Sequence, residues 1–293
     1  MRIGLTGATG FVGRAVLKLA HQRGHEVIAF TRSPERPIEW ASEQREFSLD
    51  ALPNLSGCEA MIHLAGEPIL GLWTPEKRRK IVQSRVEGTR RVVEAIAKLE
   101  ANPEVFVCAS AIGWYGDAGE TELTESSPRG LGFFADTCAA WEHEAKQAAT
   151  ERIVCARTAV VLGRGSGAIK VMKPIFKAGL GGIIGSGQQW MSWIHLEDHA
   201  RLLLYAVENM DIRGPLNASA PWPVRHSDFV KTFARALHRP ALFRVPAFAV
   251  KLLLRGLSAE LLDSKRVLPQ AALDHGFGFK YPELEPALRD LLN

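Results

Sequence analysis

Three glycines near the start of the chain have the spacing of a phosphate-binding turn. Gly7, Gly10 and Gly13 follow the short apolar run 3–5 and open a segment whose apolar residues recur at helical spacing. In a strand–turn–helix unit such glycines permit a tight turn, the approach of a pyrophosphate to the backbone, and close packing of helix on strand. The helix N-terminus adds free N–H groups and a partial positive charge. We therefore predict a dinucleotide site, and the expected contact residues in this turn are Gly7, Thr9, Gly10, Phe11, Val12 and Gly13.

The residues after the second predicted strand, 25–30, indicate which dinucleotide binds. NAD sites usually have an acidic residue at this strand end, which binds the ribose 2′-OH and would repel a 2′-phosphate. Here the strand runs into Thr31 and Arg32, with Arg36 close behind. A guanidinium offers a planar, charged fork suited to phosphate oxygens, and a hydroxyl adds a donor. An exposed loop arginine is the alternative, but the pattern favours NADP over NAD.

Two side chains beyond the glycine turn could assist a proton transfer. Glu67 follows a predicted strand at 60–64 whose end should lie beside the cofactor, so its carboxylate could act as a base. An exposed turn residue before Pro68 is the alternative. Tyr115 follows the predicted strand 105–110, and no lysine is placed in sequence to lower its pKa from ~10 to 7, a shift that would need about 4 kcal/mol. As a hydrogen-bond donor to a developing oxyanion, Tyr115 would need no such shift.

The elements that position these residues alternate between strands and helices. Besides the strands already named, we expect strands at 46–50, 153–163 and 214–218, and helices at about 75–99 and 133–149. Residues 224–293 are predicted to be mostly helical, with several prolines as breaks. The chain is therefore expected to be an α/β protein: a Rossmann-type doubly wound parallel sheet with a small, mostly helical C-terminal lobe. The predicted domains are 1–170 with 194–220 for the NADP-binding part, and 171–193 with 221–293 for the lobe.

Composition and charge exclude several classes of protein. The net charge is +4, but the basic residues are scattered, and the densest group, 77–80, lies on a predicted helix, so no nucleic-acid partner is expected. No apolar run approaches the ~18 residues needed to span a membrane, and the first strand begins too early for a signal peptide. The four cysteines lie in apolar surroundings without CxxC spacing, which favours reduced, packed thiols in a cytoplasmic protein without a metal site.

Longer motifs connect the chain to a known family. The segments TGATGFVG, HLAG, ASAIGWYGD, RTAVVLG and WIHLEDHA, in this order, resemble the extended short-chain dehydrogenases/reductases. The segments LAGEPI, GLGGIIGSG and GFGFKYPELEPAL resemble a narrower, atypical subgroup, the YfcH-like "epimerase family protein" group of the NAD(P)-dependent epimerases/dehydratases. The resemblance implies bound NADP, with Thr31 and Arg32 at the 2′-phosphate. The other cofactor contacts expected from the resemblance and from the strand ends are Leu64, Ala65, Gly66, Arg85, Ser110, Val160 and Val161.

The chain departs from the wider family at the catalytic positions. That family works with a serine, a tyrosine and a lysine, the last two spaced YxxxK so that they lie one helical turn apart. Alignment of the motifs places Phe134 at the tyrosine position, Cys138 at the lysine position and Ala111 at the serine position. Ser110 precedes the aligned serine position by one residue, so its side chain is expected on the opposite face of the strand. A shift of the alignment by one residue would bring Ser110 into the serine position. The predicted catalytic candidates are therefore Tyr115, Glu67 and Ser110, and the usual base is absent.

Two functions remain open from the sequence. The first is an NADP-dependent oxidoreductase or epimerase acting on a small polar or sugar-like substrate without the usual Ser-Tyr-Lys triad, which the intact cofactor motifs favour. The alternative is a non-catalytic NADP-binding sensor or scaffold protein, which the missing triad favours. A screen for turnover of carbonyl compounds and nucleotide sugars, with cofactor absorbance as the readout, distinguishes the two functions.

Overall fold

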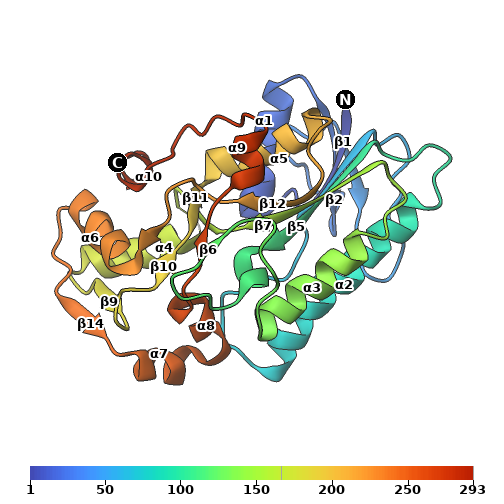
Figure 1. Cartoon of the computed structure of the whole chain (residues 1–293). Coiled ribbons are helices and arrows are strands. Elements are labelled where there is room, and N and C mark those ends of the chain that lie inside the picture. The colour runs from blue at the N-terminus through green and yellow to red at the C-terminus, as the bar shows by residue number, and fades with distance from the viewer. Residues whose placement is uncertain (166, 293) are drawn as a thin grey trace.

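A seven-stranded parallel sheet forms the centre of the protein in a computed structural model that describes residues 1–165 and 167–292 (Figure 1). The strand order is β12-β7-β5-β4-β1-β2-β3. The strands are β1 (Arg2–Thr6), β2 (Glu26–Thr31), β3 (Glu43–Glu46), β4 (Ala60–His63), β5 (Val105–Ala111), β7 (Arg152–Thr158) and β12 (Gly214–Ala218). The order reverses between β1 and β4, which is the point where open α/β sheets bind ligands. The predicted doubly wound, Rossmann-type sheet is confirmed.

Helices cover both faces of the sheet. Figure 1 shows α2 (Pro75–Ile96) and α3 (Phe133–Ala145) on one face, and α1 (Phe11–Gln22) and α5 (Leu196–Glu208) on the other. Alternate residues of each strand face opposite sides: Val107 packs in the core with α1 and α5, whereas its neighbour Phe106 packs in the core with α2 and α3. Both faces are apolar, as a parallel sheet buried on both sides requires.

The edge strand β3 differs from the expectation. We predicted a strand at 46–50, and the structure places it at Glu43–Glu46. The strand consists of polar residues and pairs only with β2. An edge strand needs no apolar face to be held in the sheet, so hydrophobic alternation could not locate it.

The C-terminal lobe is built from short elements around its own apolar core. Aromatic side chains of α4 and α6, among them Phe176 and Phe233, pack there with Leu288 of α10. The elements are β8 (Val160–Gly163), α4 (Gly167–Lys177), β9 (Gly182–Ile184), β10 (Trp190–Met191), β11 (Trp193–His195), β13 (Val224–Arg225), α6 (His226–Ala236), β14 (Phe243–Val245), α7 (Ala247–Leu254), η2 (Arg255–Leu257), α8 (Ser258–Leu262), β15 (Arg266–Val267), α9 (Gln270–Asp274) and α10 (Leu284–Leu292). The 3-10 turn η1 (Ile112–Tyr115) and the strand β6 (Glu122–Leu123) precede them in the chain.

Part of the tail returns to the central sheet. Ala272 of α9 and Phe277 belong to the core that α1 and α5 share with the sheet. The buried carboxylate of Asp198 in α5 accepts hydrogen bonds from the backbone N–H groups of Lys280 (2.8 Å) and Tyr281 (2.7 Å). The tail, which the predicted domain division assigns to the lobe, therefore packs against both the lobe and the central sheet.

No helix within residues 1–165 and 167–292 combines the length and hydropathy needed to cross a bilayer. In the same residues, no three histidine, cysteine or acidic side chains are grouped so as to hold a metal ion.

Candidate functional site

The glycine turn between β1 and α1 has the geometry of a phosphate cradle. A Cβ atom at Gly13 would lie 2.1 Å from the carbonyl oxygen of Gly7, so only glycine lets α1 approach β1 this closely. Gly7 has φ +71°, and a Cβ there would lie 2.9 Å from the carbonyl carbon of Leu64. Gly10 is the N-cap of α1 and no side chain caps the helix, so the first N–H groups have no partner within the helix. These features fit a pyrophosphate bound at the helix N-terminus.

Thr6 joins the carboxyl ends of β1 and β4 beside this turn. Its hydroxyl accepts hydrogen bonds from the backbone N–H groups of Leu64 (3.1 Å) and Ala65 (3.2 Å) and contacts Nδ1 of the buried His63 at 2.7 Å. Burial lowers the pKa of His63 to about 3, so this ring is neutral. Thr6 was not among the predicted site residues, although it stands in the TGATGFVG motif; it holds the predicted contact residues Leu64 and Ala65 against the turn.

Phe11, the first residue of α1, packs against the end of β8. The ring of Phe11 fills the space over Gly163 at the end of β8, where a Cβ would lie 2.4 Å from it. Val160 and Val161 precede Gly163 in β8 and are half-buried. Thr9 and Gly10 at the tip of the turn are exposed, and Val12 is half-buried.

The two residues predicted to select NADP lie at the carboxyl end of β2, beside β1. Arg32 is exposed and forms no ion pair within the described part of the chain. The Thr31 hydroxyl accepts a hydrogen bond from the backbone N–H of Ser33 (3.3 Å). The guanidinium is therefore available to a phosphate group at this strand end.

Arg85 reaches the end of β4 from α2. Its guanidinium donates to the carbonyl oxygens of Glu67 (3.0 Å) and Ile81 (3.2 Å) and lies 5.1 Å from the centre of the Trp141 ring. A Cβ at Gly66 would lie 3.6 Å from this guanidinium. Burial lowers the pKa of Arg85, which stays a cation beside the predicted cofactor edge.

Glu67 is about one third exposed and already paired. Its carboxylate contacts Lys77 Nζ at 2.6 Å, and its backbone N–H donates to the hydroxyl of Ser84 at 2.9 Å. Glu67 follows the end of β4, and both its place at the cofactor edge and its use as a base stay predictions.

Ser110 and Tyr115 belong to a buried polar network. The Ser110 hydroxyl donates to Glu142 (2.8 Å), and the same carboxylate forms two short contacts with Arg157 (2.8 and 3.0 Å). The Tyr115 hydroxyl donates to Asn217 (2.7 Å) and accepts from Arg157 (3.1 Å). Burial raises the pKa of Tyr115, and both side chains are nearly inaccessible. A substrate or cofactor would have to displace a buried partner to reach either hydroxyl. These contacts therefore do not support the predicted site roles of Ser110 and Tyr115.

The positions aligned with the family's tyrosine and lysine meet next to Gly113, directly after β5. A Cβ there would lie 3.0 Å from Phe134 Cβ and 3.6 Å from Cys138 Sγ. The Cys138 thiol donates to the Ala111 carbonyl at 3.6 Å, and burial raises its pKa to about 12. A carboxylate oxygen of Glu260, from α8 in the lobe, lies 3.7 Å from the same Cβ position. Sequence reasoning missed Glu260, because 147 positions (260 minus 113) separate it from Gly113 and no local pattern marks it.

The thiols give a testable prediction. All four cysteines are buried and free, and burial raises the pKa of Cys58 to about 11 and those of Cys138 and Cys155 to about 12. Because the thiolate is the reactive form, we expect almost no alkylation of the native protein by iodoacetamide near neutral pH, and complete alkylation once it is unfolded. Mass spectrometry of the intact protein measures both. Rapid modification of Cys138 in the folded protein would contradict the packed arrangement.

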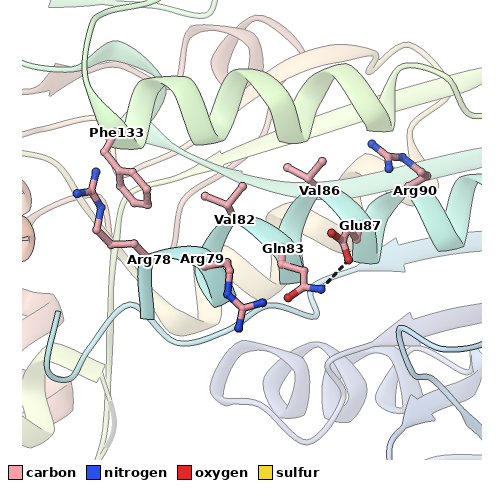
Figure 2. A pocket seen from close by; sticks show the side chains of 8 residues that line it. All are labelled: Arg78, Arg79, Val82, Gln83, Val86, Glu87, Arg90 and Phe133. Atoms are coloured by element: carbon pink, nitrogen blue, oxygen red, sulfur yellow. Dashed lines mark hydrogen bonds between the residues drawn. The ribbon is translucent and has the colours of Figure 1, made fainter. Parts of the chain in front are cut away.

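A groove on the outer surface of the α2–α3 layer is separate from these residues. Figure 2 shows side chains of α2 along its floor, with Phe133 of α3 beside Arg78. Its volume is about 520 Å³, and the Arg78 guanidinium lies 4.6 Å from the centre of the Phe133 ring. None of the predicted site residues lines this groove, so it is not part of the candidate site.

Comparison with known proteins identifies the family. The model of the NAD dependent epimerase/dehydratase family matches residues 3–218, which include the sheet and the glycine turn. The chain belongs to this family. A second model, of a domain of unknown function (DUF1731), matches residues 245–291 in the lobe and tail of the chain. The resemblance inferred from the sequence motifs is confirmed.

Relatives match this member of the family over its whole length. "Epimerase family protein YfhF" of Bacillus subtilis is 38% identical over 100% of this chain and 98% of its own. "Epimerase family protein SDR39U1 homolog, chloroplastic" of Arabidopsis thaliana is 36% identical over 100% of this chain and 87% of its own. The human epimerase family protein SDR39U1 (isoform 2), crystallised with NADPH, is 34% identical over 99% of both chains, with a TM-score of 0.92. The helical C-terminal region is therefore shared as well as the sheet.

Proposed function

We propose that this chain is an NADP-dependent oxidoreductase or epimerase acting on a small polar or sugar-like substrate. The observation that carries the proposal is the glycine cradle at β1–α1 together with an exposed arginine, not a carboxylate, at the end of β2. A cofactor with a 2′-phosphate gains a charge-assisted partner at Arg32, and one with a free 2′-OH lacks its usual acceptor. The human relative crystallised with NADPH supports the same choice.

The bound dinucleotide would supply or accept a hydride, and this chain's residues would position it. The first-turn N–H groups of α1 would hold the pyrophosphate, and Thr31 and Arg32 the 2′-phosphate. Leu64, Ala65 and Gly66 would border the cofactor along β4, and Val160 and Val161 would flank the nicotinamide. The substrate would then lie at the carboxyl ends of β5 and β7, under the lobe. The proposal includes a cytoplasmic location and no nucleic-acid partner.

A non-catalytic NADP-binding sensor or scaffold is the second candidate. The observation that favours it is the replacement of the family's tyrosine and lysine by Phe134 and a buried Cys138 whose pKa is raised to about 12. A screen of carbonyl compounds and nucleotide sugars, with NADPH absorbance as the readout, separates the candidates. Turnover by the purified protein supports the enzyme, and tight NADPH binding without any turnover supports the sensor.

Cofactor choice gives a direct test. We expect NADPH to bind at least about tenfold more tightly than NADH, about 1.4 kcal/mol, and Arg32→Asp to reverse the order, because a carboxylate repels the 2′-phosphate and accepts from the 2′-OH. Fluorescence titration of both cofactors measures the two dissociation constants. The matched control is Arg235→Asp on α6 of the lobe, since the Arg235 side chain is 66% exposed and only loosely paired, at 3.6 Å, with Glu285. Equal affinities of the wild type for both cofactors would contradict the proposal.

A further inference from the structure

Glu260 and Lys265 both belong to the lobe and form an ion pair there. The Glu260 carboxylate faces Gly113, which follows the carboxyl end of β5. Lys265 Nζ lies 3.8 Å from Glu260 Oε1 and 3.6 Å from Asp263 Oδ2. The Lys265 side chain is only 5% exposed, while those of Glu260 and Asp263 are 21% and 26% exposed. The Glu260 Oε1 atom is buried and accepts no hydrogen bond within the described residues. Because a buried carboxylate oxygen without a donor is costly, this carboxylate would gain from a hydrogen bond to a ligand hydroxyl, which could approach the exposed 21% of the side chain.

The segment that carries Lys265 is held rigidly. Its backbone N–H donates to the carbonyl of Trp190 (3.1 Å), and its own carbonyl accepts from the Ser192 hydroxyl (2.8 Å). One residue earlier, the backbone N–H of Ser264 donates to Asp117 (2.9 Å), in the loop after η1. The backbone of Lys265 is therefore held in place before any ligand arrives, and its ammonium lies close to both Glu260 and Asp263, as a preorganised site requires.

The topology places this ion pair on the nicotinamide side of the sheet. The sheet consists of two mononucleotide-binding halves that meet between β1 and β4. Arg32 at the end of β2 marks the half for the adenosine phosphate, so the second half, with β4, β5 and β7, receives the nicotinamide. Glu260 Oε1 reaches the end of β5, 3.7 Å from a Cβ at Gly113. Of the three heavy atoms nearest to that position, only this one belongs to a carboxylate, and the other two, from Phe134 and Cys138, offer no proton acceptor.

We propose that Glu260 is the residue that exchanges a proton with the substrate, and that Lys265 is the positioning residue that holds its carboxylate in place. The inference rests on the proposed oxidoreductase function. In the oxidative direction the substrate C–H bond breaks and its electron pair leaves as hydride to the oxidised nicotinamide. The O–H proton passes to a carboxylate oxygen of Glu260, and the C=O bond forms. Glu260 then releases the proton to water, and in reduction it returns a proton to the carbonyl oxygen.

The first test measures binding and needs no substrate. A carboxylate near the nicotinamide attracts the cationic ring of NADP⁺ more than the neutral ring of NADPH. Glu260→Gln should therefore raise the ratio of the NADP⁺ to the NADPH dissociation constant by at least about threefold, and Glu260→Asp by less. If Glu260→Gln is unstable, Glu260→Ala replaces it in the test. This variant removes the same charge without leaving a buried amide, so it must raise the ratio of dissociation constants by the same factor. Titration calorimetry for NADP⁺ and fluorescence for NADPH measure the two constants.

The matched control is Glu285→Gln, a half-exposed carboxylate on α10 of the same lobe, paired with Arg289 at 3.3 Å. The control should keep the wild-type ratio. If Glu260→Gln and Glu260→Ala also keep it, Glu260 does not act at the nicotinamide and the proposal is wrong. A wild type that binds neither NADPH nor NADP⁺ would instead overturn the proposed function, and this inference with it.

The second test uses any substrate found in the carbonyl screen. Loss of general acid–base assistance should lower the kcat of Glu260→Gln by about 10²–10⁴-fold, and a group that acts on the proton alone should leave KM nearly unchanged. Glu260→Asp, which retains a carboxylate, should recover part of the rate. Wild-type kcat in Glu260→Gln would show that another group exchanges the proton.

Discussion

Gly13→Ala should abolish measurable NADPH binding, with an affinity loss of at least about 100-fold, or about 2.7 kcal/mol. The added Cβ would lie 2.1 Å from the Gly7 carbonyl oxygen and 2.8 Å from its carbonyl carbon, which are backbone atoms that no side-chain rotation can move. Helix α1 must then move away from β1, and the first-turn N–H groups that should bind the pyrophosphate move with it. Fluorescence titration with NADPH measures the affinity.

The matched control for this change lies at the other end of the same helix. Gly24 has φ +77°, and a Cβ there would meet no atom within 4 Å. Gly24→Ala strains the backbone by about 1 kcal/mol without displacing α1, so NADPH should bind as it does to the wild type. If Gly13→Ala also kept wild-type affinity, the glycine turn would not be the phosphate site.

The glycine cradle could be predicted from sequence because it is local. Gly7, Gly10 and Gly13 lie within seven consecutive residues, and the apolar pattern on both sides shows that a strand precedes the turn and a helix follows it. For Ser110 the sequence predicts only a side chain on the face opposite Ala111; its hydroxyl donates to Glu142 of α3, the helix that also carries Phe134 and Cys138.

The pairing of Glu260 with Gly113, and of Glu142 with Arg157, could not be predicted in this way. Each joins residues of different elements whose proximity depends on how the whole chain folds back on itself. The tail segment shows the same limit, since no local pattern shows that Phe277 joins the core that α1 and α5 share with the sheet. Periodicity identifies which face of an element is buried, but it does not identify the partner element.

Glu142→Ala should destabilise the protein by about 3–5 kcal/mol, the usual cost of removing one partner of a buried ion pair. The side chains of Glu142 and Arg157 are 2% and 4% exposed, so the guanidinium left behind would lose its counter-charge without gaining water. The Ser110 hydroxyl would lose its acceptor as well. We expect a fall in the thermal midpoint on the order of 10 °C, measured by circular dichroism near neutral pH.

Glu144, two residues further along α3, provides the control, because it forms a similarly short ion pair with Arg90 of α2. Its carboxylate lies 2.6 Å from Arg90, whose side chain is 49% exposed, so water can replace the lost partner and Glu144→Ala should cost about 0–1 kcal/mol. Replacing Glu142 and Arg157 together by methionine should recover much of the loss, because no uncompensated charge remains. Recovery should stay incomplete, since Ser110 and Tyr115 would each lose a hydrogen-bond partner. Similar costs for Glu142→Ala and Glu144→Ala would show that the buried pair is accessible to water, and that the network beneath the site is less rigid than its distances indicate.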